Sequence, residues 1–388
     1  MCEVGAAMKR VLMLASVASM IDQFNMPNIA LLQKMGYNVD IACNFIEGNT
    51  CSDERVQELK AKLNAMGVRC FQVDFARNIT RMAQNLRALW QVLHLMETEH
   101  YAFCHCHSPI GGVVARIAGH RTKTKIIYTA HGFHFYKGAP VKNWLLYYPV
   151  EKLLSRWTDV LITINREDYE RAKGNFHAKR ICYVPGVGIN LTRETLTDAQ
   201  KEAKRKELGI PEDAFLITSA AEFTENKNQK TVIEAVEKLG HPNIYFLMCG
   251  IGEKKEQLES YVSSHGLGEH IRFAGFRSDL HEILQSSDCF VLSSFREGLS
   301  VALMEAMAEG LPVVCGRIRG NDDLVADGEG GILLEPGDAN AYVQAFRELY
   351  EKKEKDPEGY RQIGQINQQN IKAFGRETVE TLMRDIYV

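Results

Sequence analysis

Short apolar runs typical of buried strands alternate with helical segments along the whole of this 388-residue chain. The first run, Arg10 to Ser16, precedes a helical segment, Met26 to Met35, which stops at Gly36 before the next run begins. Because parallel strands are joined through helical crossovers, this alternation predicts α/β domains built on parallel sheets. The further predicted strands are Tyr37 to Cys43, Arg69 to Asp74, Ala102 to Cys106, Lys125 to Ala130, Val160 to Ile164, Ile181 to Val184, Phe215 to Ala220, Ile244 to Cys249, Ile271 to Ala274, Cys289 to Leu292, Pro312 to Cys315 and Gly331 to Leu334.

The length of the chain and one interruption of the alternation predict two domains. A chain of this size exceeds what a single core usually organises. The regular order breaks at Pro185 to Asn190 and resumes after a charged helical segment, Asp198 to Leu208. We therefore expect two Rossmann-like, doubly wound domains, residues 1–187 and 188–370, facing each other across a cleft, and a closing helix over residues 371–388. Ligands of such sheets bind outside the carboxyl ends of the strands, so the loops after strands are the candidate sites.

Composition gives no sign of a membrane span, a secretory leader or a disulfide framework. The apolar run near the start, Val11 to Ala15, is far shorter than a bilayer-spanning segment, and no small-residue cleavage pattern accompanies it. The ten cysteines are therefore expected to be buried thiols of a cytoplasmic protein. The run Cys104-His105-Cys106-His107 suggests a metal site. Neighbours on a strand point to opposite faces, however, so we expect no metal there.

Charge is distributed unevenly between the two predicted domains. Residues 1–187 hold 23 Lys and Arg against 15 Asp and Glu, a net charge of +8, whereas the remainder holds 23 against 34, a net charge of −11. The basic half suits an anionic partner such as a membrane surface or a diphosphate. Uneven solvated charge without a partner is the alternative.

Glu297 and Glu305 bracket a turn and the start of a predicted helix in an E-x7-E arrangement. Gly298 allows a flexible turn, and Ser300 can cap a helix that runs to about Glu309 and stops at the following glycine. The free N–H groups at such a helix start, together with the helix dipole, form an anion site. The arrangement suits a ligand with phosphate in the middle and a hydroxylated ring at each end, such as a nucleotide sugar. Solvated surface glutamates are the alternative.

Several segments resemble those of the retaining glycosyltransferases of family 4, which have the GT-B fold. The most specific stretch runs from Ser294 to Glu305 and continues through Val314. The resemblance covers nearly the whole chain. It implies that the first domain serves the acceptor, that the second binds a nucleotide sugar, and that the C-terminal helix crosses back to the first domain. Two further runs are similar to members that build capsular polysaccharide or exopolysaccharide: Thr129-Ala130-His131-Gly132-Phe133-His134 and Glu225-Asn226-Lys227-Asn228-Gln229.

For the second domain, the resemblance implies a role for each residue of the motif. Glu305 would accept hydrogen bonds from both ribose hydroxyls, because two carboxylate oxygens suit a vicinal diol. Glu297 would hold the donor sugar and stabilise positive charge at the anomeric carbon. Lys227 would stabilise the leaving diphosphate, with a solvated loop lysine as the alternative. Backbone N–H groups of four successive residues would contact the sugar or the diphosphate: Gly298, Leu299, Ser300 and Val301.

The resemblance also implies contacts from three other strand ends. His131 would donate or accept a hydrogen bond at the donor sugar or diphosphate, with a structural histidine as the alternative. Gly250 and Gly252 would let the backbone approach the nucleotide, although a G-x-G without a third glycine is weak evidence for that. Phe276 and Arg277 resemble the loop that recognises the base, where main-chain atoms would make the contacts, with or without help from the side chains.

Three segments depart from the family pattern or remain open. Glu222 stands where the family usually has an arginine, five residues before Lys227, so one of two usual phosphate-binding cations is missing. The first loop, Ser16 to Gln23, lacks the paired glycines of many members and is expected to shape the acceptor side. The apolar and partly basic segment Val141 to Trp157 is either a core or interdomain helix or a membrane-interface helix.

The sequence thus predicts a metal-independent, retaining glycosyltransferase. It would move a sugar from a nucleoside-diphosphate donor, most readily a UDP-sugar, to a glycan or polyprenyl-diphosphate-linked acceptor in surface polysaccharide synthesis. We expect no cofactor, no metal and no nucleic-acid partner, and a cytoplasmic location with peripheral contact at the inner face of the membrane. A nucleotide-sugar epimerase of the same fold and a non-catalytic, two-lobed sugar-binding protein are the alternatives. A dehydrogenase is excluded because no G-x-G-x-x-G follows a predicted strand.

Overall fold

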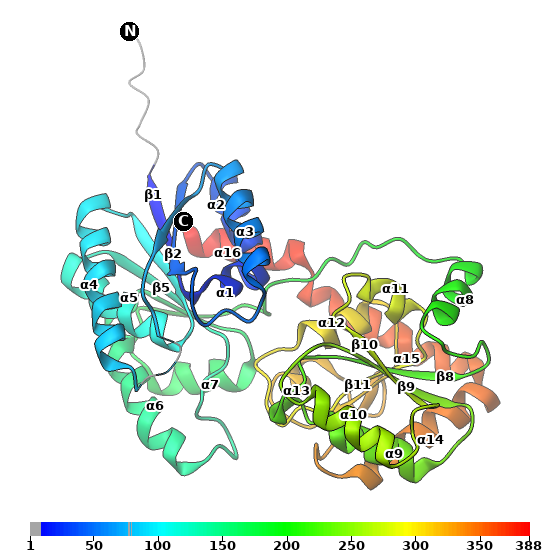
Figure 1. The fold of residues 1–388 in the computed structure, drawn as a ribbon. Coiled ribbons are helices and arrows are strands. Elements are labelled where there is room, and N and C mark those ends of the chain that lie inside the picture. The colour runs from blue at the N-terminus through cyan, green and yellow to red at the C-terminus, as the bar shows by residue number, and fades with distance from the viewer. Residues whose placement is uncertain (1–8, 77, 79) are drawn as a thin grey trace. The chain divides into compact units, whose positions relative to one another are not determined.

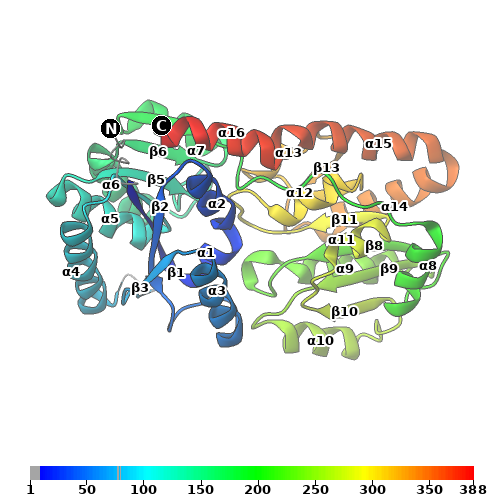
Figure 2. The same ribbon diagram turned by 90° about the horizontal axis from the view of Figure 1, so that it is seen from above.

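The computed structural model describes residues 9–76, 78 and 80–388 and forms two compact units (Figure 1). The first unit extends to Gly188 and includes the C-terminal segment Glu377–Val388. The second unit is Ile189–Arg376. The sequence placed the first boundary after residue 187 and the beginning of the returning segment at residue 371. Figure 2 shows the same ribbon from above.

The first unit is built on a seven-stranded parallel sheet in the order β3-β2-β1-β4-β5-β6-β7. Its inner strands are buried on both faces, which explains why their sequences are continuous apolar runs without polar alternation. The strands are β1 (Arg10–Val17), β2 (Asn38–Asn44), β3 (Arg69–Gln72), β4 (Phe103–His107), β5 (Lys125–Ala130), β6 (Val160–Thr163) and β7 (Arg180–Tyr183).

Helices cover both faces of this sheet, and each face has its own hydrophobic core. One face packs against α1 (Ala18–Phe24), α2 (Met26–Lys34), α3 (Asp53–Ala65) and α16 (Arg376–Tyr387). The other face packs against α4 (Met82–Glu99), α5 (Pro109–Thr122), α6 (Val141–Leu154) and α7 (Arg166–Asn175). The short helix η1 (Ser155–Trp157) continues α6, so the predicted helix from Val141 to Trp157 changes to a tighter turn at its end.

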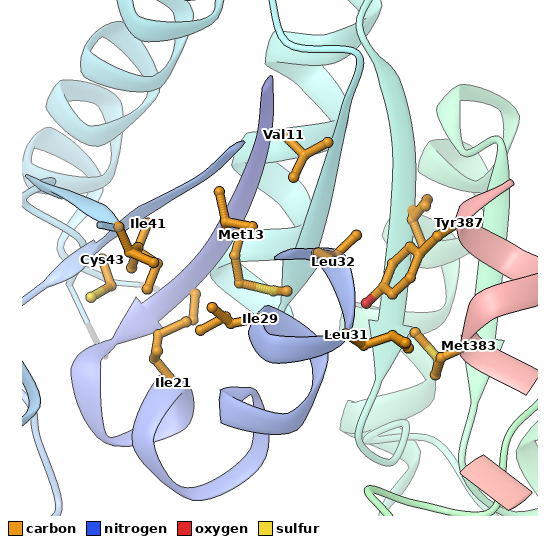
Figure 3. Close-up of a cluster of buried hydrophobic side chains, with 14 of the residues drawn as sticks. Val11, Met13, Ile21, Ile29, Leu31, Leu32, Ile41, Cys43, Met383 and Tyr387 are labelled. Atoms are coloured by element: carbon orange, nitrogen blue, oxygen red, sulfur yellow. The ribbon is translucent and has the colours of Figure 1, made fainter. Parts of the chain in front are cut away.

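The C-terminal helix α16 belongs to the core of the first unit. Figure 3 shows its side chains Met383 and Tyr387 beside Leu31 of α2, in the cluster that also contains Met13 of β1. The Tyr387 ring stacks on Phe103 of β4, with the ring centroids 5.6 Å apart. The predicted return of the C-terminal helix to the first domain is therefore confirmed.

The second unit is a six-stranded parallel sheet in the order β10-β9-β8-β11-β12-β13. Its order reverses between β8 and β11, which places the loops after these two strands next to each other. The strands are β8 (Phe215–Ala220), β9 (Ile244–Cys249), β10 (Ile271–Gly275), β11 (Cys289–Leu292), β12 (Val313–Gly316) and β13 (Gly331–Leu334).

The helices of the second unit again form cores on both faces of the sheet. One core contains side chains of α9, α10 and α14, and the opposite one contains side chains of α12 and η3. The helices are α8 (Asp198–Glu207), η2 (Glu225–Lys227), α9 (Gln229–Leu239), α10 (Lys255–Ser264), α11 (Leu280–Gln285), α12 (Val301–Ala308), α13 (Asn321–Leu324), α14 (Ala339–Lys355), α15 (Pro357–Asn370) and η3 (Ile371–Phe374).

Candidate functional site

The second unit brings two of the predicted site residues into direct contact. Lys227 lies in the short helix η2 after β8, and Glu297 lies in the loop after β11. The Lys227 ammonium donates to Glu297 Oε1 over 2.6 Å. Both side chains remain partly exposed, at 24% and 12%. A cation and an anion at neighbouring strand ends can serve a ligand that carries both a diphosphate and a developing positive charge.

Polar contacts between the two loops fix this pair. The Asn226 amide donates to the carbonyl oxygen of Arg296, and the Phe295 N–H donates to the carbonyl oxygen of Asn226. The Ser293 hydroxyl forms hydrogen bonds with the Lys227 and Asn228 carbonyls. Since Lys227 and Glu297 belong to loops joined in this way, their separation is set by the backbone and not only by their mutual attraction.

Helix α12 begins as the sequence predicts. The Ser300 side chain accepts a hydrogen bond from the Leu303 N–H over 3.3 Å, so Ser300 is its N-cap. The helix ends at Ala308, and Gly310 follows with φ +77°, a conformation that suits glycine. Glu305 lies in the second turn, and its side chain is 24% exposed. The N–H groups of the first turn and the Glu305 carboxylate are therefore on one short helix.

Glu305 is already paired with an arginine that sequence reasoning did not select. The Arg193 guanidinium donates to Glu305 Oε1 over 2.8 Å and lies 3.6 Å from Glu309. Arg193 belongs to the segment between Ile189 and α8, which the sequence marked only as a domain connection. No local motif identifies it, because the contact spans more than a hundred residues. Binding of a ribose diol at Glu305 has to share this carboxylate with Arg193 or displace the guanidinium.

The turn at Gly298 is pressed against a second loop. A Cβ added at Gly320 would overlap the carbonyl oxygen of Gly298, and Gly320 has φ +83°. Arg319 is largely buried beside it and donates to the Glu297 carbonyl oxygen over 3.2 Å. This close approach holds the backbone of the E-x7-E turn in place.

Gly250 and Gly252 have a role inside the fold. A Cβ at Gly250 would overlap the carbonyl oxygen of Ala221, and one at Gly252 would overlap the backbone of Phe223. Both glycines therefore allow the loop after β9 to lie against the loop after β8, which leads to Lys227. This packing explains the G-x-G pattern without a nucleotide, and the predicted nucleotide contact of these two residues stays a prediction.

Phe276 and Arg277 follow β10 and differ in their surroundings. The Phe276 side chain is 77% exposed, so its ring is available to a ligand. Arg277 forms ion pairs with Asp279 and with Glu207. The hydrogen bonds to Asp279 raise the pKa of Arg277, and the same contact lowers the pKa of the Asp279 carboxyl. The guanidinium of Arg277 thus forms ion pairs with two carboxylates. Recognition of the base by the main chain of this loop stays a prediction.

His131 lies in the first unit, directly after β5, and is half-buried beside two other histidines. Its Nε2 lies 3.0 Å from Nδ1 of His107, and its ring packs against Phe24 with the centroids 5.6 Å apart. His105 contacts the Tyr387 hydroxyl through Nδ1 at 2.9 Å and Thr129 through Nε2 at 2.8 Å. Sequence reasoning considered His105 and His107 only as metal ligands and gave them no other role.

Burial keeps these imidazoles neutral. It lowers the pKa of His105 to about 3 and that of His131 to about 4. It also lowers the pKa of His107 far below the ordinary value, with a further contribution from the other two rings. In a neutral histidine, one ring nitrogen donates and the other accepts.

The contacts of His107 assign the tautomer of His131. Nε2 of His107 lies 3.2 Å from the Met13 sulfur, which can only accept, so this nitrogen carries the proton. Nδ1 of His107 then accepts, and Nε2 of His131 must donate to it. His131 is left with Nδ1 as a hydrogen-bond acceptor. A small pocket adjoins the ring, and its lining includes Asn25, Asn28 and Gly186.

The cysteines of the Cys104-His105-Cys106-His107 run face away from these histidines. Cys104 and Cys106 pack in the core beneath α4 and α5, whereas His105 reaches Tyr387 of α16 on the opposite face. Within residues 9–76, 78 and 80–388, no group of three or more His, Cys, Asp or Glu side chains is placed to hold a metal ion. Glu222, at the position of the missing arginine, is exposed in the loop after β8.

Two family models match the chain, one in each unit. Residues 26–186 match the glycosyl transferase 4-like domain, and residues 200–368 match the glycosyl transferases group 1. EpsD of Bacillus subtilis (strain 168), named as a glycosyltransferase, is 36% identical over 98% of this chain and 96% of its own length. The Escherichia coli protein named UDP-Gal:alpha-D-GlcNAc-diphosphoundecaprenol alpha-1,3-galactosyltransferase is 29% identical over 72% of this chain and 74% of its own.

Solved structures of similar fold cover nearly the whole chain. HepE of Anabaena, in a complex with UDP-glucose, has a TM-score of 0.77 at 17% identity and covers 97% of this chain and 99% of its own. Sucrose-phosphate synthase of Thermosynechococcus elongatus has a TM-score of 0.76 at 18% identity and covers 98% of both chains. At these identities the likeness shows the fold, and it confirms the predicted fold class.

Proposed function

Because this chain belongs to glycosyltransferase family 4 and has the GT-B fold, we propose that it transfers a hexose-type sugar from UDP with retention of configuration. The acceptor is a glycan or a polyprenyl-diphosphate-linked sugar in the synthesis of a surface polysaccharide. The observation that carries the proposal is the ion pair of Lys227 and Glu297 in the unit that also presents Glu305 on the capped helix α12. The complex of HepE with UDP-glucose supports the donor, and the name of the Escherichia coli relative supports the lipid-linked acceptor.

The roles follow from the charges of the side chains. The diphosphate binds at the Lys227 ammonium and the first-turn N–H groups of α12, which stabilise the negative charge that grows as the bond to the sugar breaks. Glu305 accepts hydrogen bonds from the ribose hydroxyls. Glu297 lies against the sugar and stabilises positive charge at the anomeric carbon. Nδ1 of His131 accepts a hydrogen bond from a donor-sugar hydroxyl.

Retention is explained by departure and attack on the same face of the sugar. The bond from the anomeric carbon to the diphosphate oxygen breaks, and the bond from that carbon to the acceptor oxygen forms on the same side. The acceptor proton passes to the departing diphosphate oxygen. Glu297 acts through its charge and not as a covalent nucleophile. The reaction uses no metal, so we expect turnover to persist in EDTA.

The assignment of Glu305 is tested by UDP affinity, measured by calorimetry on the purified full chain. Charge-assisted hydrogen bonds contribute about 1.5–3 kcal/mol each, so Glu305→Gln should weaken UDP binding by about 10- to 100-fold. Glu348→Gln, an exposed change on α14 of the same unit, is the matched control and should leave binding unchanged. UDP affinity unchanged in Glu305→Gln would falsify the ribose assignment.

The assignment of Lys227 is tested by turnover, measured as UDP release in the presence of acceptor. Lys227→Met should lower kcat by about 100- to 1000-fold, the usual cost of removing a group that stabilises transition-state charge. Conversion of the UDP-sugar without any acceptor would point instead to the epimerase. Donor identity follows from the same assay with a panel of nucleotide sugars, each first screened for a rise in melting temperature.

A further inference from the structure

Helix α6 exposes an apolar face to solvent. Val141 and Leu145 are 72% and 74% exposed, and Leu153 is 52% exposed. Leu146 and Val150 are also exposed on the same helix. At 100° per residue these side chains and Pro149 share the side of α6 that faces away from the sheet. The opposite side buries Leu154 and packs Trp144, Tyr147 and Tyr148 against the core.

An apolar outward face is unusual for a helix on the surface of a domain. Surface helices normally present charged residues to water. Helix α14 of the second unit follows that rule, since its exposed positions are Asn340, Gln344, Arg347, Glu348, Glu351, Glu354 and Lys355. Helix α6 is apolar on the side that packs against the sheet and also on the side that faces solvent. Helices with two apolar sides usually contact apolar groups on both. Its exposed face therefore indicates contact with an apolar environment.

The exposed charges of α6 and its continuation η1 are all positive. Lys142 and Arg156 are exposed on the outward side of α6 and its continuation η1, and Lys152 lies beside them. The one acid within α6, Glu151, points inward, where it is buried and paired with Arg116 at 2.7 Å. Glu151 also accepts from the Tyr128 hydroxyl. The outward face thus offers apolar side chains between cations and presents no carboxylate of its own helix.

This composition fits one occupant. We propose that the outward face of α6 docks on an anionic phospholipid membrane surface, with its apolar side chains in the interface and its cations at the lipid phosphates. A protein partner of similar affinity would be expected to meet these cations with carboxylates, and a second copy of the same face would bring cations against cations. The excess of 23 Lys and Arg over 15 Asp and Glu in residues 1–187 adds long-range attraction to the same surface.

The helix lies on the membrane and does not cross it. Its 14 residues span about 21 Å, less than the roughly 30 Å hydrocarbon core. Among the helices in the described part of the chain, none has the length and hydropathy that a bilayer span requires. Pro149 removes one backbone donor from the exposed stretch, and the interface supplies water to the carbonyl that loses its partner. The inference rests on this surface and not on the proposed reaction.

The test is sedimentation of the full chain with vesicles of 30% phosphatidylglycerol in phosphatidylcholine, compared with phosphatidylcholine alone. Binding should require the anionic lipid and weaken as salt is raised. Leu145→Glu/Leu153→Glu should lower the partition coefficient at least tenfold. Lys142→Gln and Arg156→Gln should each lower it about fivefold at low salt, and the loss should shrink at high salt.

Controls separate docking from folding and from the reaction. Ile46→Glu places the same charge on an exposed apolar residue outside α6 and should leave vesicle binding unchanged. Each variant should keep the melting temperature and the UDP affinity of the parent, since none of these residues belongs to the nucleotide site. Equal vesicle binding by the parent and the Leu145→Glu/Leu153→Glu variant would overturn the proposal. So would a concentration-dependent dimer that this variant dissociates, since α6 would then be an interface between copies.

Discussion

The buried histidines of the first unit predict that this unit loses stability as the pH falls from 6.5 to 4.5. His105 is fully buried, and its pKa of about 3 in the folded protein lies well below its ordinary value of 6.5. When the pKa of a histidine is lower in the folded protein than in the unfolded chain, the stability of the folded protein is highest above pH 6.5. It decreases as the pH falls from 6.5 towards the pKa of the folded state. The unfolded chain binds the proton first, so acid favours unfolding.

The size of the effect follows from these two values. A single histidine with pKa values of 6.5 unfolded and about 3 folded costs about 2 kcal/mol of unfolding free energy between pH 6.5 and 4.5. His107 is equally buried and its pKa is shifted in the same direction, so it adds a loss of the same sign. Unfolded carboxyl groups titrate mostly below this window, which leaves histidines as the main contributors within it.

Tryptophan fluorescence isolates the first unit in this measurement. The three tryptophans of the chain, Trp90, Trp144 and Trp157, all precede residue 188. Urea unfolding followed by their emission at pH 6.5 and 4.5 therefore reports the free energy of the first unit. His105→Gln removes one titrating ring, and the drop in stability across the window should shrink by about 2 kcal/mol.

A matched control measures how much the removal of an exposed histidine changes the pH dependence of stability. His94→Gln changes an exposed position on α4 and should leave the drop unchanged. The reasoning is refuted if the parent is equally stable at both pH values. It is refuted as well if the parent and His105→Gln lose the same free energy, because the acid sensitivity would then arise elsewhere.

Three further predictions concern buried or paired side chains. Glu151→Gln leaves Arg116 as a buried cation without its carboxylate and should cost about 3–5 kcal/mol in urea unfolding followed by tryptophan emission. Gly364→Ala places a Cβ against a backbone carbonyl oxygen and should cost about 1–3 kcal/mol, measured by circular dichroism, which also reports the second unit. Arg193→Ala removes the cation shared by Glu305 of α12 and by Glu309, the residue that follows the helix. Because Glu305 is partly exposed, the loss in the same assay should be only about 0.5–1 kcal/mol.

The parallel sheets could be predicted from the sequence because their inner strands are short, buried on both faces and separated by helices. The predicted strands Lys125 to Ala130 and Phe215 to Ala220 agree with β5 and β8 residue for residue. At β4 the prediction was wrong by one residue at each end, since the strand is Phe103–His107. His107 pairs with Thr129 of β5, and a polar residue at a strand end does not differ in pattern from a loop residue.

The site was less accessible to sequence reasoning, because its contacts join distant segments. The cap at Ser300 is local and was predicted from the residues that follow it. The partner of Glu305 was not, since Arg193 reaches it from a connecting segment without a motif. His107 did have a signal. It ends the strand next to the one that precedes His131, and parallel pairing brings such ends together.

Both acids of the E-x7-E arrangement are therefore bound to cations before any ligand is present. Lys227 holds Glu297 at 2.6 Å, and Arg193 holds Glu305 at 2.8 Å. In the proposed reaction, a diphosphate bound by Lys227 would compete with Glu297 for the ammonium, and the released carboxylate would face the sugar as positive charge develops there. A ribose bound at Glu305 would make the same exchange with Arg193. The proposed function therefore predicts that donor binding separates these two ion pairs and frees each charged group for its role in transfer.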